Sequence, residues 1–197
     1  MDVDSILVVM ALEIEAQGRL DQEPVLFTGL GKVNATYRLA RRLAEERAQG
    51  RRPMVVNFGT AGSRRFPTGA VVSCHRFVQR DMDVRELGFA LGQTPFEELP
   101  ATLQFASHFP DLAHGVCATG DRFETSDHIA DWEVIDMEAY AFAKVCHFEN
   151  VPFACAKYIT DGADSNASND WQANLPRAAE AFSRLLGELR ERLNLPR

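Results

Sequence analysis

The sequence predicts an α/β protein in which residues 1–197 form a single three-layer domain, with a central mixed, largely parallel sheet flanked by helices. Short apolar runs, typical of strands buried on both faces, alternate with amphipathic helical patterns. The length of 197 residues suits one domain, and the chain contains no internal repeat, low-complexity tract or linker-like stretch. With 46% hydrophobic and 25% charged residues, the composition is that of an ordinary globular protein.

The expected strands are apolar segments that end in glycine or polar residues. In chain order they cover residues 6–10, 54–58, 69–74, 116–119, 134–137 and 153–159. Most of these segments are followed by a helical pattern or by a turn. The alternation therefore favours a sheet covered by helices on both faces.

The expected helices follow apolar side chains spaced three and four residues apart. One begins after Gly29-Leu-Gly-Lys32, where a charged run forms the solvated face, and another follows residues 134–137. The last helix is expected to start at Pro176, which suits a first turn, and to carry a stripe of leucine and phenylalanine. Between them, the glycine- and proline-rich residues 85–114 predict loops with one short helix near residues 102–107.

Charge and motif content exclude several functional classes. The formal net charge of −7 disfavours nucleic-acid binding, and no apolar run is long enough for a membrane span. Two aspartates near the start argue against a signal peptide, so a cytoplasmic location is expected. The four cysteines and five histidines are dispersed, so no metal site is expected. The Gly29-Leu-Gly-Lys32 segment lacks P-loop spacing and no dinucleotide fingerprint is present, so no cofactor is expected.

Carboxylates and glycines punctuate the ends of the predicted strands. Acidic residues stand at the ends of four apolar runs, namely Glu13 and Glu15, Asp121, Asp136 and Glu138, and Asp161 and Asp164. Because ligands collect where the strands of such sheets end, we expect these carboxylates to converge. Buried carboxylates close to one another have raised pKa values, which suits general acid catalysis. A single acidic residue at a strand end is more often a helix cap or a solvated turn, so the prediction rests on the group.

Several of these segments together resemble the nucleoside phosphorylase superfamily, and within it most closely the bacterial 5′-methylthioadenosine/S-adenosylhomocysteine nucleosidases. The matching segments occur in family order: Ala11-Leu-Glu-Ile-Glu15, Gly29-Leu-Gly-Lys-Val-Asn34, Asn57-Phe-Gly-Thr-Ala-Gly62, Asp81-Met-Asp-Val84 with Gly88-Phe89, Thr119-Gly-Asp-Arg-Phe123, Asp136-Met-Glu-Ala139 and Ile159-Thr-Asp-Gly-Ala-Asp164. Each segment is weak evidence alone, whereas seven in order form a specific signal.

The resemblance implies a role for each catalytic position. Asp161 matches the acid that protonates the departing adenine, and Glu15 matches the glutamate that activates water. Glu138 matches the residue that holds the ribose hydroxyls. Met137 and Thr60 match family positions that line the sugar, and Phe123 and Glu124 match positions beside the purine. Lys157 matches a position beside the water, where the family usually has an arginine. Cleavage of an N-glycosidic bond needs one group that donates a proton to the departing purine and a second group that takes a proton from the attacking water. Glycoside hydrolysis uses two carboxyl groups in the same way.

Five apolar residues match the family positions around the 5′-substituent, namely Leu30, Val84, Leu87, Phe89 and Trp171. Their apolar character suits an alkylthio group better than a phosphate. The resemblance also implies a homodimer in which the region around Leu87 and Phe89 reaches toward the neighbouring site.

The sequence departs from the family pattern at three places. The segment between Glu15 and Gly29 is short, Glu124 stands where an apolar residue is usual, and Asp136 replaces a glutamate. Three alternatives therefore stay open beside a hydrolase of this nucleoside type: a phosphate-dependent purine nucleoside phosphorylase, a hydrolase of another 5′-modified purine nucleoside, and a non-catalytic nucleoside-binding protein. A carboxylate at the nucleophile position would repel phosphate, which favours hydrolysis.

Overall fold

Eight strands form one mixed sheet in the computed structural model, which describes residues 3–20, 24–124, 132–162 and 167–195. The strands, in chain order, are β1 (Ser5–Met10), β2 (Val25–Phe27), β3 (Pro53–Gly62), β4 (Val71–Gln79), β5 (Thr102–Gln104), β6 (Ala113–Thr119), β7 (Val134–Asp136) and β8 (Phe153–Asp161). Five of the pairings are parallel and three are antiparallel. The expectation of a mixed, largely parallel sheet is confirmed.

The sheet closes on itself around five of its strands. β3 pairs with β8, β8 with β4, β4 with β6, and β6 with β7, and β7 returns to β3 through the single pair Gly62 and Ile135. Gly62 is also the register partner of Asp161, next to an irregularity in the β3–β8 ladder. The closure therefore brings the ends of β3, β7 and β8 to one place.

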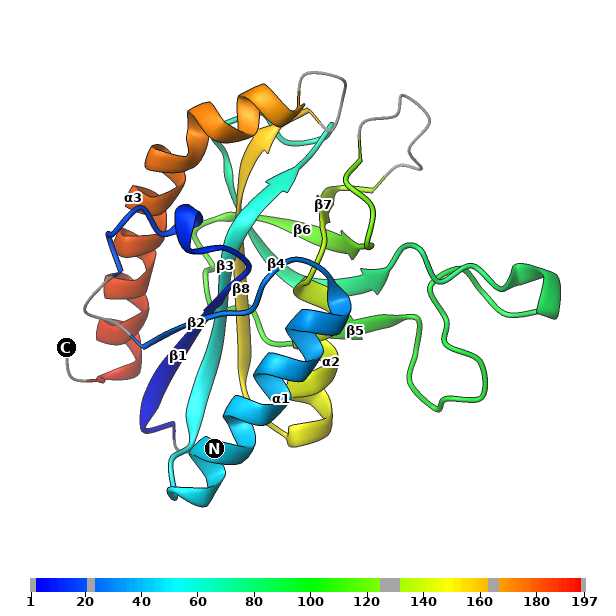
Figure 1. Cartoon of the computed structure of the whole chain (residues 1–197), viewed down its shortest axis with the longest axis horizontal. Coiled ribbons are helices and arrows are strands. Elements are labelled where there is room, and N and C mark those ends of the chain that lie inside the picture. Colours follow the sequence, from blue (N-terminus) through cyan, green and yellow to red (C-terminus); the bar gives the residue numbers. More distant parts are fainter. Residues whose placement is uncertain (1–2, 21–23, 125–131, 163–166, 196–197) are drawn as a thin grey trace.

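Helices cover both faces of the sheet (Figure 1). α1 (Lys32–Ala48) and α2 (Ala139–Glu149) pack side by side on one face, where Leu39 and Phe142 belong to one core cluster. α3 (Ala167–Leu193) covers the other face, where Phe182 stacks on Phe58 of β3 with ring centroids 5.1 Å apart. Two apolar cores thus lie on either side of the sheet and complete the three layers.

Three local expectations differ from the structure. Residues 102–104 form β5 instead of a short helix, because buried Leu103 alternates with exposed neighbours and the segment pairs antiparallel with β4. The short edge strand β2 was not expected. α3 begins at Ala167 and not at Pro176, so this proline lies inside the helix, where it removes a backbone hydrogen-bond donor.

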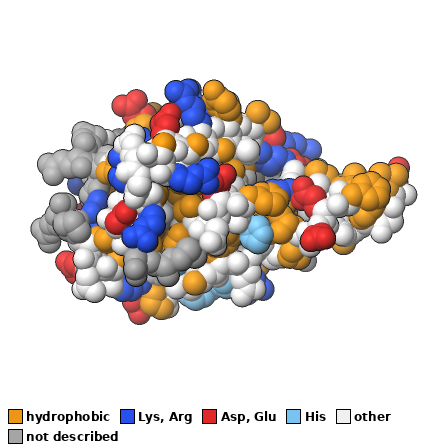
Figure 2. Space-filling view, turned by 90° about the horizontal axis from the view of Figure 1, so that it is seen from below, with side chains coloured by type: hydrophobic (Ala, Val, Ile, Leu, Met, Phe, Trp, Pro, Cys, Tyr) orange, Lys and Arg blue, Asp and Glu red, His pale blue; other side chains and the backbone are white. Residues whose placement is uncertain are grey.

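An arm formed by residues 82–101, between β4 and β5, extends away from the body of the molecule (Figure 1). It contains the short 3₁₀ helix η2 (Arg85–Leu87), and hydrophobic side chains gather on it in the space-filling view (Figure 2). Phe96 and Leu87 are 94% and 69% exposed.

In the part of the chain that the structure describes, no helix combines the length and apolar character that crossing a membrane requires.

Candidate active site

One cavity of about 400 Å³ opens at the ends of five strands. Its walls come from the last residues of β3, β7 and β8 and from the segments that follow β1, β6 and β7, together with Leu30 before α1 and Trp171 of α3. Nine of the residues predicted from the sequence line it: Glu15, Leu30, Thr60, Phe123, Glu124, Met137, Glu138, Asp161 and Trp171. The predicted convergence of strand-end carboxylates therefore occurs in the structure.

Glu15 is fixed by hydrogen bonds from three backbone and side-chain donors. It lies in the 3₁₀ helix η1 (Glu13–Glu15) and is 4% exposed. The Thr60 amide and hydroxyl donate to Glu15 Oε1 at 2.9 and 2.8 Å, and the Leu12 amide donates to Oε2 at 3.1 Å. Trp171 Nε1 in turn donates to Thr60 Oγ1 at 2.9 Å. These bonds hold a carboxylate in one orientation at the cavity wall, as a base for a bound water requires.

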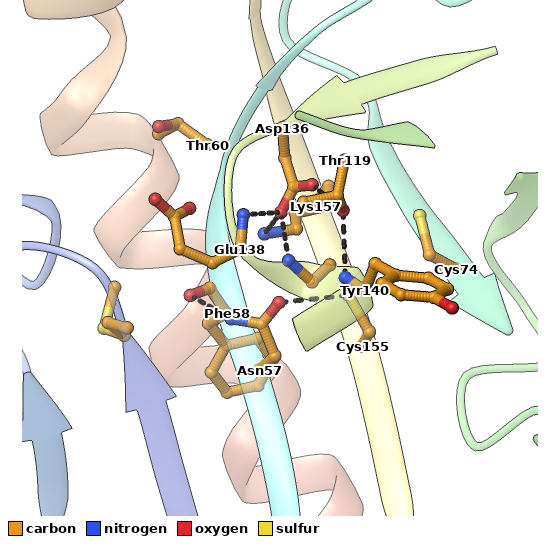
Figure 3. A network of polar contacts seen from close by, with 12 residues as sticks. Asn57, Phe58, Thr60, Cys74, Thr119, Asp136, Glu138, Tyr140, Cys155 and Lys157 are labelled. Carbon is orange, nitrogen blue, oxygen red and sulfur yellow. Dashed lines mark hydrogen bonds and ion pairs between the residues drawn. The ribbon is translucent and has the colours of Figure 1, made fainter. Parts of the chain in front are cut away.

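Beneath the cavity, Asp136 and Lys157 form a buried ion pair (Figure 3). Lys157 Nζ lies 2.9 Å from Asp136 Oδ2, and the side chains are 2% and 1% exposed. Burial alone would raise the pKa of Asp136, but the charge of Lys157 together with the hydrogen bonds from Thr119, Lys157 and the Ala139 amide outweighs burial and lowers this pKa. Burial alone would likewise lower the pKa of Lys157, but the surrounding negative charge, to which Asp136 contributes most, raises it above its ordinary value. Both groups are therefore ionised.

The carboxylate of Asp136 also anchors the start of α2. It accepts hydrogen bonds from the amides of Glu138 and Ala139 at 3.2 and 2.8 Å, and from the Thr119 hydroxyl at 2.5 Å. Thr119 Oγ1 accepts from the Tyr140 amide at 2.9 Å. Because Glu138 directly precedes α2, this network sets where its side chain enters the cavity.

Glu138 is a buried carboxyl group with a strongly raised pKa. It is 6% exposed, and Oε1 accepts a hydrogen bond from the Gly31 amide at 2.8 Å. Burial raises the pKa of Glu138 to about 8, with a further contribution from the charge of Asp136 that the opposite charge of Lys157 only partly offsets. At neutral pH this group is mostly protonated and can both donate and accept a hydrogen bond.

Asp161 ends β8 and lies on the cavity wall with 4% of its surface exposed. The neighbouring Thr160 hydroxyl donates to Asp161 Oδ2 at 2.7 Å, and the Asp161 carbonyl accepts from the Ser63 amide at 3.1 Å. The backbone is thus held between β8 and the end of β3. The side chain stands in a largely enclosed position that suits an acid acting on a bound ligand.

Phe123 and Glu124 line another part of the cavity. Phe123 lines the cavity and is 49% exposed. Glu124 Oε2 lies 3.3 Å from Arg80 Nη1, and both side chains are more than nine-tenths buried. Arg122 Nη2 approaches Glu124 Oε1 at 3.4 Å. Sequence reasoning missed Arg80, because no spacing links it to a residue so far along the chain.

Four residues predicted for the site lie outside the cavity lining. Lys157 lies beneath the wall, bound to Asp136, close to Gly59. Val84, Leu87 and Phe89 belong to the protruding arm, and the Phe89 ring contacts that of Phe96 at 5.4 Å. The single chain therefore does not bring these arm residues to the carboxylates.

No metal-binding group of three histidine, cysteine or acidic residues occurs among the residues described. All four cysteines are buried free thiols, and burial raises the pKa of Cys117 to about 11 and also raises the pKa of Cys146. Because these two thiols stay protonated, Cys117 and Cys146 are poor nucleophiles and poor metal ligands. Most of the ionisable side chains on the cavity wall are carboxyl groups, which can donate or accept protons and can form hydrogen bonds with a polyhydroxylated ligand.

Comparison with known proteins agrees with this geometry. The family model of the phosphorylase superfamily matches residues 16–191. A 5′-methylthioadenosine/S-adenosylhomocysteine nucleosidase of Anoxybacillus flavithermus is 32% identical, with 90% of this chain and 84% of the relative covered. The corresponding Staphylococcus saprophyticus protein is 30% identical, with 88% and 84% covered.

Solved structures show the same fold. A nucleosidase of this name from Neisseria meningitidis, in complex with methylthio-immucillin-A, has a TM-score of 0.80 at 24% identity and covers 95% of this chain and 98% of its own. A futalosine hydrolase of Helicobacter pylori has a TM-score of 0.82 at 21% identity, with 96% and 98% covered. The chain therefore belongs to the phosphorylase superfamily, in which its curated relatives are 5′-methylthioadenosine/S-adenosylhomocysteine nucleosidases.

Proposed function

We propose that this protein is an N-glycosyl hydrolase that cleaves 5′-methylthioadenosine and S-adenosylhomocysteine-type nucleosides into adenine and the thioribose. The observation that carries the proposal is the convergence of Glu15, Glu138 and Asp161 in one cavity. The names of the curated relatives supply the substrate class.

Each carboxyl group takes the role that its surroundings allow. Glu15, oriented by Thr60 and the backbone, activates the water. Asp161 donates a proton to the departing base. Glu138, with its raised pKa, exchanges hydrogen bonds with the ribose hydroxyls. Lys157 acts from below, since it holds Asp136 and contributes positive charge beneath these groups.

The apolar part of the cavity suits a 5′-alkylthio group. Leu30, Ile135 and Met137 line it together with Trp171, whose ring is fixed by its bond to Thr60. Such a surface disfavours a phosphate, because burying a charged group without a partner is costly. The same carboxylate-lined cavity favours water over phosphate as the nucleophile.

The test is to incubate purified protein with methylthioadenosine, with and without phosphate, and to measure adenine and the sugar product. We expect adenine and free methylthioribose at the same rate in both conditions. Strict dependence on phosphate would make the protein a phosphorylase. Asp161→Asn should abolish turnover and leave the circular dichroism spectrum unchanged, whereas Glu188→Gln, on the exposed side of α3, should retain full activity.

The proposal includes a homodimer in the cytoplasm. The exposed apolar side chains of the arm, Leu87 and Phe96 among them, offer a surface that a second copy could cover, which would bring Val84 and Phe89 toward a site. Four buried free thiols fit a reducing compartment. Sedimentation analysis should give twice the chain mass, and Leu87→Asp should shift it toward the monomer; a monomeric wild-type protein would contradict the dimer.

A further inference from the structure

We propose that Glu124, held in place by Arg80, selects the base by accepting a hydrogen bond from an N–H group on the edge of the purine. The inference rests on the proposed function, since it concerns the base of the same nucleoside. It defines the substrate class as purines that carry such a donor. These are adenine, through its six-amino group, and six-oxopurines, through N1–H.

The Glu124 carboxylate belongs to the cavity wall and is rigidly supported. It lines the cavity beside Phe123, with its side chain only 8% exposed. Arg80, 9% exposed, reaches Glu124 Oε2 at 3.3 Å and donates through Nη2 to the Arg122 carbonyl at 2.5 Å. One guanidinium therefore braces both the side chain of Glu124 and the backbone two residues before it.

The backbone leaves space for this arrangement. A β-carbon added at Gly120 would lie 3.0 Å from Arg80 Cζ and Nε. A residue with a side chain at this position would crowd the Arg80 guanidinium, which would have to shift by a few tenths of an ångström. Gly120 and Glu124 lie in one segment after β6, and together with Arg80, from a distant part of the chain, they form one structural unit at the cavity.

The chemistry of the carboxylate determines what it can recognise. An ionised carboxylate accepts hydrogen bonds and donates none. An N–H of the base placed against Glu124 gains a charge-assisted bond, whereas a ring nitrogen with its lone pair in the same position is repelled. A base without an N–H would place an acceptor or an apolar group against the carboxylate and would not form this bond.

A specific alternative is that Glu124 only neutralises Arg80. In that case its replacement would alter stability or overall rate by the same factor for every base. A base-reading role instead changes the ratio of rates between bases. The ratio is therefore the quantity to measure, and it cancels intrinsic differences among leaving groups because each base is compared in wild type and variant.

The experiment uses nucleosides that share the 5′-methylthio group and carry adenine, hypoxanthine, unsubstituted purine or six-dimethylaminopurine. We measure kcat/KM for wild type, Glu124→Leu, Glu124→Gln and Arg80→Leu. The quantity compared is the ratio of kcat/KM for the adenine or hypoxanthine nucleoside to kcat/KM for the two nucleosides whose bases lack an edge N–H. We expect this ratio to be about 10- to 100-fold larger in wild type than in Glu124→Leu. Comparison of the adenine and hypoxanthine nucleosides shows whether Glu124 binds the six-amino group or N1–H.

Two further variants separate the contact between Glu124 and the base from the positioning of Glu124 by Arg80. Glu124→Gln keeps an acceptor oxygen and should retain part of the discrimination, and Arg80→Leu should reduce it by releasing Glu124. Glu188→Gln, a glutamate in an exposed pair with Arg184 on α3, should leave all ratios unchanged. Equal ratios in wild type and Glu124→Leu would overturn the inference.

A binding measurement keeps this inference separate from the proposed function. Calorimetric titration with free adenine and with unsubstituted purine should give a preference for adenine that is lost in Glu124→Leu, whether or not the nucleosides are cleaved. Absence of cleavage with this preference intact would contradict only the hydrolase. Cleavage with the same preference in both proteins would contradict only the role of Glu124.

Discussion

Replacement of Lys157 by methionine tests the ion pair beneath the cavity. Methionine has a similar length and flexibility but carries no charge, so the change leaves little empty space. It removes the partner of Asp136, whose side chain is 1% exposed. Among the described residues, the two hydrogen bonds from the start of α2 and the one from Thr119 then remain to support a buried carboxylate.

The expected loss of stability follows from this burial. Removing one partner of a buried ion pair costs about 3–5 kcal/mol, because the remaining charge is left without compensation. With a urea dependence of about 2 kcal/mol per molar, the unfolding midpoint should fall by about 1.5–2.5 M. The variant should also lose activity, since the network that places Glu138 depends on Asp136.

The assay is urea unfolding followed by far-ultraviolet circular dichroism for wild type, Lys157→Met, Asp136→Asn and the double variant. If the two side chains act as a pair, the double variant should be more stable than the sum of the single losses predicts by at least about 1 kcal/mol. Additive losses, or a loss below about 1 kcal/mol in Lys157→Met, would refute the reasoning.

Three further predictions concern single positions. Glu138→Gln should flatten the pH dependence of the free energy of unfolding. Because the pKa of Glu138 is raised to about 8, this group stabilises the folded state at pH values below its ordinary pKa of 4.5, and the contribution is lost as the pH rises through about 8. The urea midpoints of the variant at pH 5, 7 and 9 should therefore lie closer together than those of the wild type. Thr60→Val removes the hydroxyl that donates to Glu15 and should lower kcat by about tenfold; an unchanged kcat would show that this bond does not orient Glu15. Gly31→Ala, at a φ of 88°, should reduce stability by about 1–2 kcal/mol in thermal unfolding, and a neutral effect would contradict the assigned backbone strain.

The sequence indicated most of the fold because its evidence is local. The apolar run at residues 54–58 and the helical spacing after Lys32 are properties of neighbouring residues, and both elements occur where they were expected. β5 and the true start of α3 were missed for the opposite reason. Pairing of residues 102–104 with β4 depends on residues far along the chain, which spacing does not record.

The candidate site divides in the same way. Glu15, Glu138 and Asp161 could be named from the sequence because each follows an apolar run and belongs to a family-like segment. Their surroundings could not. Closure of the sheet, which joins β7 to β3 through one residue pair, is needed before these three groups share a cavity.

The sequence by itself determined the class of fold, the order of most elements and the identity of the carboxyl groups, since these depend on periodicity and on short motifs. Only the tertiary structure decided that Lys157 pairs with Asp136 below the cavity and that Arg80 supports Glu124 beside it. The physical reason is that such pairs are selected by burial: charges from distant segments, enclosed in the same low-dielectric space, must compensate one another.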